Sequence, residues 1–359
     1  WRTKKLLIGA GLLAGILPIA HMHSFIAVVI ISGSICLNIF YKFLKNKHSG
    51  KLPARAFKKI IKNILYFVVP VTILSTALFF TFVYGGIQKE DFMRISLGWT
   101  SQKDLISWIV MWWKLWGVML PLAIYSLRSL ILKNKSLTFQ PSQFFYGFFA
   151  LFIISNIIVF QPTAWDNTKL FAWVYLGFSL LAAHMIIDLW QNLKNKTNKT
   201  NGSKILQKVA SVTLIIMLST TGVLELIRLQ GFDKNTYKLS DTENIKLAKQ
   251  VMKTTPTNAV FLTASDHNHP LLMWGSRQVV LGYKGWVTNF GFDIDEKSRD
   301  VKNIFEQPAK YIYLLEKYNI DYVVIGEAEK REFVVDQEFF NKNFNEYSKN
   351  NNTFIYIYE

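Results

Sequence analysis

The sequence has little cysteine and few acidic residues, and it does not begin with methionine. Its one cysteine, Cys36, lies inside an apolar run, which excludes a disulfide framework and a cysteine-based metal centre. Only 24 residues are Asp or Glu against 41 Lys or Arg, and charged residues make up 18% of the chain. Soluble domains carry about 25% charged residues. Because Trp1 directly precedes an apolar run, we interpret the chain as the C-terminal portion of a longer protein.

Long apolar runs fill the first 230 residues. A bilayer core of roughly 30 Å needs about 20 apolar residues in a helix. We predict seven membrane spans, at 6–20, 25–41, 64–86, 107–127, 144–160, 170–190 and 205–228. The first two runs form either a tight hairpin or one broken helix. The predicted fold is a multi-spanning α-helical membrane protein, with a transmembrane domain over 1–230 and a small α/β domain over 231–359.

The Lys and Arg residues gather in alternate loops between these spans. The loops 1–5, 42–62, 128–135 and 191–204 hold 3, 8, 3 and 4 of them. The intervening loops 21–24, 87–104 and 161–169 hold 0, 3 and 1. By the positive-inside rule, the first set faces the cytoplasm, so the domain at 231–359 is extracytoplasmic. We therefore assign the net charge of +17 to contacts with membrane lipids and not with nucleic acid.

The C-terminal domain alternates between helical and strand patterns. We predict helices at 241–254, 308–318 and 335–344, with strands at 260–262, 279–282, 322–326 and 353–358. Short apolar runs between helices are typical of a small, mainly parallel sheet. Ligands of such sheets bind beyond the carboxyl ends of the strands. The polar segment 265–269 follows the first strand, and the segment 283–286 follows the second.

Reactive side chains gather in the segments assigned to the outer face. They include two His-x-His pairs, His21 with His23 and His267 with His269, and these four histidines are candidates for binding the substrate. In extended backbone this spacing points both rings to one side, which suits a divalent metal. Two histidines do not complete a metal site, however, and structural polar contacts are the favoured interpretation, so no cofactor is predicted.

The loop at 161–169 holds a Trp-Asp-Asn sequence. Asp166 and Asn167 would contact sugar hydroxyls there, and Asp166 is also a candidate acid or base. The alternative is that Asp166 caps the span that follows. The two interpretations carry equal weight.

Two basic residues are candidates for binding an anion. Lys114 lies inside the fourth span among four tryptophans. It either contacts a lipid-linked phosphate or extends to the outer interface within an aromatic belt, and the second interpretation is favoured. Arg277, in the C-terminal domain, is placed either to clamp a phosphate or carboxylate or to form a structural salt bridge with an aspartate.

Four segments carry a resemblance to a known family: 17–24 (LPIAHMHS), 165–169 (WDNTK), 280–286 (VLGYKGW) and 321–327 (DYVVIGE). With them the chain resembles the C-terminal part of bacterial membrane glycosyltransferases of the GT-C fold, a group that includes protein O-mannosyltransferases and aminoarabinose transferases. The resemblance implies transfer of a sugar from a polyprenyl-phosphate carrier on the extracytoplasmic face. The family's catalytic base lies in the first external loop, which nothing here matches. Asp166 and Asp266 are therefore candidates by location alone.

Two other functions compete with this one. The first is a non-catalytic envelope scaffold, whose external domain binds a glycan or a protein partner. The second is a transporter, which needs ionisable groups at the middle of the membrane and usually inverted repeats. The sequence offers only His184 and Asp188 there and shows no repeat, so the transporter is the weakest of the three. No feature of the sequence sets an oligomeric state.

Overall fold

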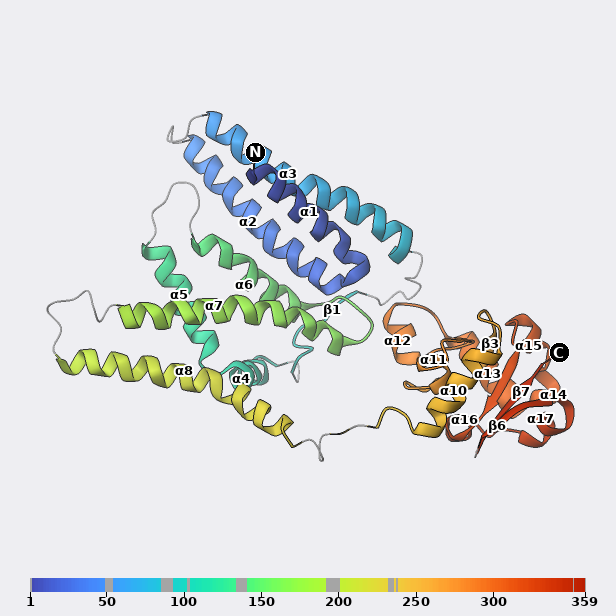
Figure 1. Cartoon of the computed structure of the whole chain (residues 1–359). Coiled ribbons are helices and arrows are strands. Elements are labelled where there is room, and N and C mark those ends of the chain that lie inside the picture. Colours follow the sequence, from blue (N-terminus) through green and yellow to red (C-terminus); the bar gives the residue numbers. More distant parts are fainter. Residues whose placement is uncertain are drawn as a thin grey trace. The chain divides into compact units, whose positions relative to one another are not determined.

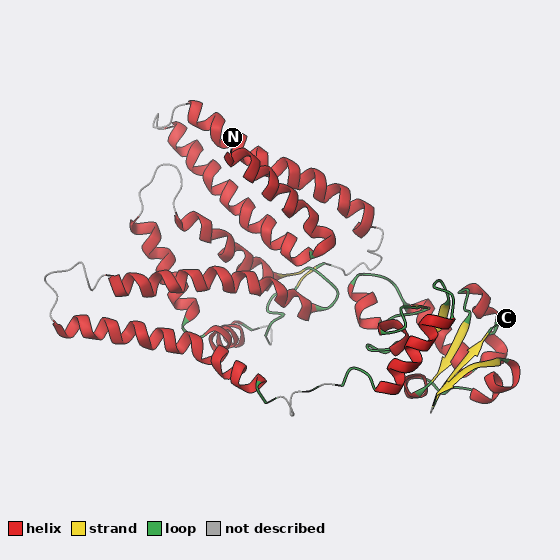
Figure 2. Cartoon of the chain, viewed as in Figure 1, coloured by secondary structure: helices red, strands yellow, loops and turns green. Residues whose placement is uncertain are grey.

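The computed structural model describes residues 2–48, 54–84, 93–101, 104–133, 141–191, 201–231, 236, 238–350 and 352–358. The chain divides into two compact units, Trp1–Gly231 and Phe232–Glu359. We call them unit 1 and unit 2. Unit 1 is almost entirely helical, whereas unit 2 surrounds a β-sheet with short helices (Figure 2).

Every predicted apolar run of unit 1 contains helix. The elements are α1 (Arg2–Ala20), α2 (Met22–His48), α3 (Ala54–Leu78) continuing into the π-helix η1 (Phe79–Val83), α4 (Leu105–Trp116), α5 (Met119–Lys133), α6 (Pro141–Ile157), the 3₁₀ helix η3 (Ala164–Thr168), α7 (Lys169–Gln191) and α8 (Asn201–Leu229). Five of the described helices are long and apolar enough to cross a membrane. The prediction of a multi-spanning helical protein followed by a small α/β domain is confirmed.

Two of the seven predicted runs differ in detail. The run at 107–127 is not one straight span, because α4 and α5 meet at an angle of 90°. The bend lies at Gly117, whose φ of +48° is in the left-handed region that favours glycine. The run at 144–160 forms α6, a helix of 17 residues, which is shorter than the five described helices that are long enough to cross a membrane. The first two runs form the hairpin α1–α2, whose helices are separated by His21 (Figure 1).

Glycines let the helices of unit 1 approach closely. A Cβ atom added at Gly11 in α1 would lie 2.6 Å from the backbone oxygen of Phe67 in α3. One added at Gly147 in α6 would lie 2.6 Å from the Cα atom of Ile31 in α2. Small residues at such crossings are characteristic of membrane helices, where tight packing replaces the hydrophobic effect as the driving force.

The helix ends of unit 1 fall into two sets. Figure 1 shows the carboxyl ends of α2, α5 and α7 at one end of the unit. The α1–α2 turn, η3 and a two-stranded antiparallel ribbon lie at the other end. This ribbon pairs β1 (Arg94–Ile95) with β2 (Ile158–Val159). The ends next to the lysine-rich loops are thus separated from the ends that carry His21, His23 and Asp166.

Unit 2 contains a five-stranded sheet. Its strands are β3 (Val260–Leu262), β4 (Gln278–Val279), β5 (Tyr322–Ile325), β6 (Asn345–Asn350) and β7 (Thr353–Ile357), in the order β4-β3-β5-β7-β6. Its helices are α10 (Thr242–Thr254), α11 (Pro270–Met273), α12 (Lys284–Asn289), α13 (Asp295–Glu306), α14 (Pro308–Tyr311), α15 (Tyr313–Lys317), α16 (Glu327–Glu332) and α17 (Gln337–Asn343).

The prediction of a mainly parallel sheet is wrong in part. β3 pairs in parallel with β4 and β5, but β7 is antiparallel to both β5 and β6. Only two residues separate β6 from β7, and a connection that short joins antiparallel strands. The sequence did not predict β6 or α13.

Both faces of the sheet are covered. Alternate residues of a strand point to opposite faces. Leu262 and Val323 pack with residues of α13, α15 and α17. Phe261 and Val324 pack with residues of α10 and α11. The resulting three layers leave the carboxyl ends of β3 and β5 side by side, with the loop after β3 and helix α16 above them.

Candidate functional site

In unit 1, the α1–α2 turn and η3 bring together three predicted site residues, His21, His23 and Asp166, and their neighbour Lys169. The rings of His21 and His23 lie 5.5 Å apart between centroids. Lys169 Nζ is 2.7 Å from an Asp166 carboxylate oxygen. Both of these charged residues, as well as His21, act electrostatically on His23. We call His21, His23, Asp166 and Lys169 the turn cluster.

The members of the turn cluster differ in exposure. His23 is buried, with 8% of its surface accessible, whereas His21 is exposed and its Nδ1 atom is 2.8 Å from the hydroxyl of Ser24. The Asp166 and Lys169 side chains are partly exposed. Beside them, Trp165 presents 77% of its surface. An exposed indole next to a cation at a helix end is typical of the membrane interface.

Asn167 holds η3 in place. Its amide nitrogen donates to the backbone oxygens of Ser155 and Ile158, both at 3.0 Å, and its amide oxygen accepts from Phe160 N at 3.2 Å. The side chain is completely buried. Its amide is therefore committed to the backbone, while its predicted contact with a substrate stays untested. Asp166 forms an ion pair with Lys169, the first residue of α7, and its capping of that helix stays a prediction.

Sequence reasoning missed Asn156, which organises the same end of unit 1. Its amide oxygen accepts from the indole nitrogens of Trp108 at 2.7 Å and Trp112 at 3.1 Å. Trp99 donates to Ser155 O at 2.8 Å. A polar residue within an apolar run was the signal that could have identified Asn156. These bonds fix the tryptophans that surround the start of α4.

Lys114 does not share the buried face of these tryptophans. It is exposed in the last turn of α4, whereas Trp112 is buried. Both interpretations of Lys114, a phosphate contact and extension to the interface, stay predictions.

His184 is one of the two ionisable residues expected inside the membrane, in the sixth predicted span. Its Nδ1 atom is 3.0 Å from the hydroxyl of Ser126 in α5.

In unit 2, Glu329 is the centre of a buried polar arrangement at the carboxyl ends of β3 and β5. One of its carboxylate oxygens accepts from Ala264 N at 2.8 Å and lies 3.1 Å from His269 Nε2; the other accepts from Gly326 N at 2.9 Å. Burial opposes its charge, but the bonds from His269 and Ala264 outweigh burial and hold the pKa of the carboxyl below its ordinary value.

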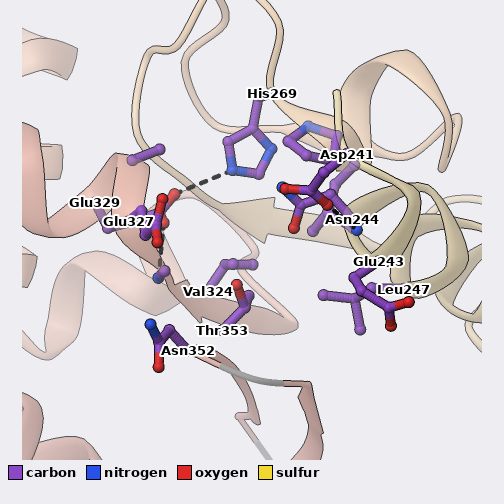
Figure 3. A pocket seen from close by; sticks show the side chains of 14 residues that line it. Asp241, Glu243, Asn244, Leu247, His269, Val324, Glu327, Glu329, Asn352 and Thr353 are labelled. Carbon is purple, nitrogen blue, oxygen red and sulfur yellow. Dashed lines mark hydrogen bonds and ion pairs between the residues drawn. The ribbon is translucent and has the colours of Figure 1, made fainter. Parts of the chain in front are cut away.

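A cavity of about 240 Å³ borders this arrangement. Figure 3 shows His269 and Glu329 joined by a hydrogen bond at its wall, with Asp241 and Asn244 of the α10 region opposite. The Nδ1 atom of His269 is buried and has no hydrogen-bond partner among the residues that the structure describes. The predicted candidate His269 therefore has one nitrogen fixed by Glu329 and one without a partner.

A second cavity, of about 430 Å³, lies on the other side of the loop after β3. The ring of His267 contacts Tyr283 and Trp286, with centroids 4.7 and 4.5 Å apart. Asp266 forms an ion pair with Arg331. The segments 265–269 and 283–286 were predicted to follow the first and the second strand. These strands are neighbours in the sheet, and the two segments meet at its edge.

Arg277 lies away from both cavities and is buried. Its guanidinium donates to the hydroxyl of Thr255 and to the backbone oxygens of Met252, Thr255, Gly275 and Ser276. These partners are neutral oxygens. One of the two interpretations of Arg277 was a salt bridge with an aspartate, and neutral oxygens take that place here. They connect the end of α10 to the segment before β4, which is a structural role, and the anion-binding role stays untested.

Across the described ranges, no group of three or more His, Cys, Asp or Glu side chains is placed to hold a metal ion. In unit 1 the neighbours of the His21–His23 pair include a lysine, which is unfavourable beside a divalent cation. The side chains of the turn cluster suit hydrogen bonding and anion binding better than metal coordination.

Together the units define a membrane protein with a multi-spanning helical part and a mixed α/β domain. The chain is similar to an oligosaccharyltransferase from Archaeoglobus fulgidus, solved with a tethered acceptor peptide containing an NVT sequon. The TM-score is 0.41 and the identity 14%, over 80% of this chain and 36% of that one. The chain therefore spans about a third of that protein's length. No protein-family model and no curated protein matches the sequence.

Proposed function

We propose that the chain belongs to a membrane-embedded glycosyltransferase, which transfers a sugar from a polyprenyl-phosphate carrier on the extracytoplasmic face. The observation that carries the proposal is the turn cluster. Two sequence segments more than 140 residues apart, around His23 and Asp166, place two imidazoles, a carboxylate and an ammonium group at one end of the membrane helices. The sequence resemblance to GT-C enzymes supports the same reaction.

Each group of the cluster has a part that its chemistry suits. Glycosyl transfer breaks the bond between the sugar and its phosphate, and the acceptor hydroxyl loses a proton. Lys169 would bind the phosphate, because an ammonium group stabilises the charge that grows on the leaving oxygen. Asp166 would accept a hydrogen bond from the acceptor hydroxyl or take its proton. His21 would contact the sugar, and the buried His23 would hold η3 against the α1–α2 turn.

The test measures sugar transfer by the full-length protein in lipid nanodiscs. The donor is a mixture of polyprenyl-phosphate sugars extracted from a bacterial membrane. We expect Asp166→Asn and Lys169→Gln each to lower the rate by about 100-fold or more, the range for loss of a catalytic acid, base or charge contact. The control is Glu225→Gln, which removes an exposed ion pair with Arg228 in α8 and should leave transfer unchanged. Full transfer by both variants would refute the assignment.

A non-catalytic envelope scaffold is the second candidate. The observation that favours it is that both candidate carboxylates already form ion pairs, Asp166 with Lys169 and Asp266 with Arg331. An adjacent cation stabilises the charged form of a carboxylate and weakens it as a base. In that case the nanodisc protein would bind a glycan or a partner through unit 2 and show no transfer with any donor.

A further inference from the structure

The second cavity of unit 2 combines an aromatic wall with a charged rim. It is lined by Ala264, Ser265, Asp266, His267, Tyr283, Ala328, Arg331 and Glu332. The rings of His267 and Tyr283 form the wall. Trp286 does not line the cavity itself but packs against both rings, with 53% of its surface exposed. We call this site the aromatic cleft. Binding sites typically pair an apolar, aromatic lining with a few placed polar groups.

The rim groups are held in place by one another. Glu332 accepts from Ser265 N at 2.8 Å and forms an ion pair with Lys284 at 2.6 Å. Arg331 forms an ion pair with Asp266. Each carboxylate has lone pairs beyond these bonds, and the guanidinium has five N–H donors, of which this pair occupies few. The rim therefore offers donors and acceptors in fixed positions without rearrangement.

The position of the cleft in the fold also fits a ligand site. Strand β3 has β4 on one side and β5 on the other, so the connections after β3 and β5 leave the sheet in different directions. In open α/β sheets, ligands bind beyond the carboxyl ends of strands at such a switch point. Ser265 and His267 follow β3, and Arg331 and Glu332 lie in α16 after β5.

We propose that the aromatic cleft binds a single pyranose ring of a glycan. A pyranose has a face of C–H groups, which suits an aromatic wall, and an edge of hydroxyls, which suits carboxylates and a guanidinium. A volume of about 430 Å³ admits one ring and lies within the roughly 300–1,000 Å³ of small-molecule sites. The site goes beyond the transfer reaction proposed for unit 1, and its binding is measured without any transfer.

The test uses the full chain in nanodiscs made from deuterated lipid and measures saturation-transfer NMR. The probes are methyl α-D-glucopyranoside and methyl α-D-mannopyranoside at millimolar concentration. We expect saturation transfer to the ring protons of at least one probe. Trp286→Ala and Arg331→Gln should each weaken binding about tenfold, as expected for one aromatic contact or one charged hydrogen bond.

Matched controls come from the same unit. Trp274→Ala removes a partly exposed tryptophan at the end of α11, outside the aromatic wall, and Lys330→Gln removes an exposed cation adjacent to Arg331 in sequence. Both controls should bind as the unaltered chain does. Binding that survives in Asp166→Asn, while transfer is lost, would show that the cleft and the proposed reaction are separate.

Three outcomes would overturn the proposal. The first is the absence of saturation transfer to either pyranoside. The second is an equal signal from sorbitol, which has the hydroxyls but no ring face. The third is stronger binding of adenosine than of both pyranosides, which would assign the aromatic wall to a flat ring instead of a sugar.

Discussion

Glu329 gives the sharpest test of the energetics of unit 2. Its carboxylate is 1% exposed and accepts bonds from Ala264 N, Gly326 N and His269 Nε2. In Glu329→Gln one oxygen becomes an NH₂ group, which cannot accept. At least one of the backbone N–H donors then faces another donor. A buried donor without a partner costs about 1–3 kcal/mol, and the change also removes the ionic contribution to the His269 bond.

We therefore expect Glu329→Gln to lower the free energy of unfolding of unit 2 by about 2–4 kcal/mol, the sum of one orphaned donor and a weakened charged hydrogen bond. Glu327→Gln is the matched control, because Glu327 is exposed two residues away on the same helix. It should change stability by less than about 0.5 kcal/mol, as is usual for surface positions.

The assay is urea denaturation of the full chain in nanodiscs, followed by hydrogen exchange at the amides of Ala264 and Gly326. At least one of these two amides should exchange faster in Glu329→Gln, because the single oxygen of the Gln side chain can replace only one of the two carboxylate oxygens that accept from them. A loss of stability no larger than that of Glu327→Gln, with unchanged exchange at both amides, would refute the assignment of Glu329 as a buried charged acceptor.

The pH dependence of the same group has a definite sign. The pKa of Glu329 is lower in the folded chain than its ordinary value of 4.5. Its contribution to stability is therefore complete above pH 4.5 and is lost as the pH falls from there through the folded pKa. Glu329→Gln should remove this part of the acid sensitivity. If urea midpoints between pH 5 and pH 3 fell equally in both proteins, Glu329 would not be its source.

Three further changes test the packing, the polar network and the sidedness of unit 1 and unit 2. Gly177→Ala adds a Cβ atom 2.3 Å from a phenyl ring and should cost about 1–3 kcal/mol in thermal unfolding, whereas Gly222→Ala, with open space around it, should cost little. Asn156→Ala should cost about 2–3 kcal/mol by leaving two indole N–H groups without an acceptor, and tryptophan fluorescence should shift to longer wavelength. In a Cys36→Ser background, a membrane-impermeant maleimide added to whole cells should label Lys297→Cys; failure would contradict the extracytoplasmic assignment.

Local sequence determined the helices of unit 1 and several elements of unit 2. An apolar run longer than a bilayer is wide predicts a membrane helix without knowledge of its neighbours. Helix α10 was predicted to begin at residue 241 and begins at Thr242. The prediction succeeded because the signal is local: Asp241 caps the helix by accepting from Asn244 N. The strands before residues 265–269 and 283–286 were also predicted, and with them the edge of the sheet that carries both cavities.

Tertiary structure decided what depends on partners far away in the chain. Strand β6 has a polar sequence without alternation, and it exists as a strand because β7 pairs with it. Glu329 belongs to the charged segment 327–332, which resembles an exposed helix. Only the fold buries it, beneath the loop after β3. No pattern in the sequence around residues 23 and 166 predicted that His23 and Asp166 would come within electrostatic range of each other.

Hydropathy and helix caps are properties of neighbouring residues, and the sequence alone therefore determined the membrane helices and the sheet-edge position of His267 and His269. The loop charges predict the sidedness in the same local way. The turn cluster and the aromatic cleft each join segments separated by dozens of residues. Their geometry depends on helix packing and strand order, which the free energy of the whole fold decides and no short stretch of the chain encodes.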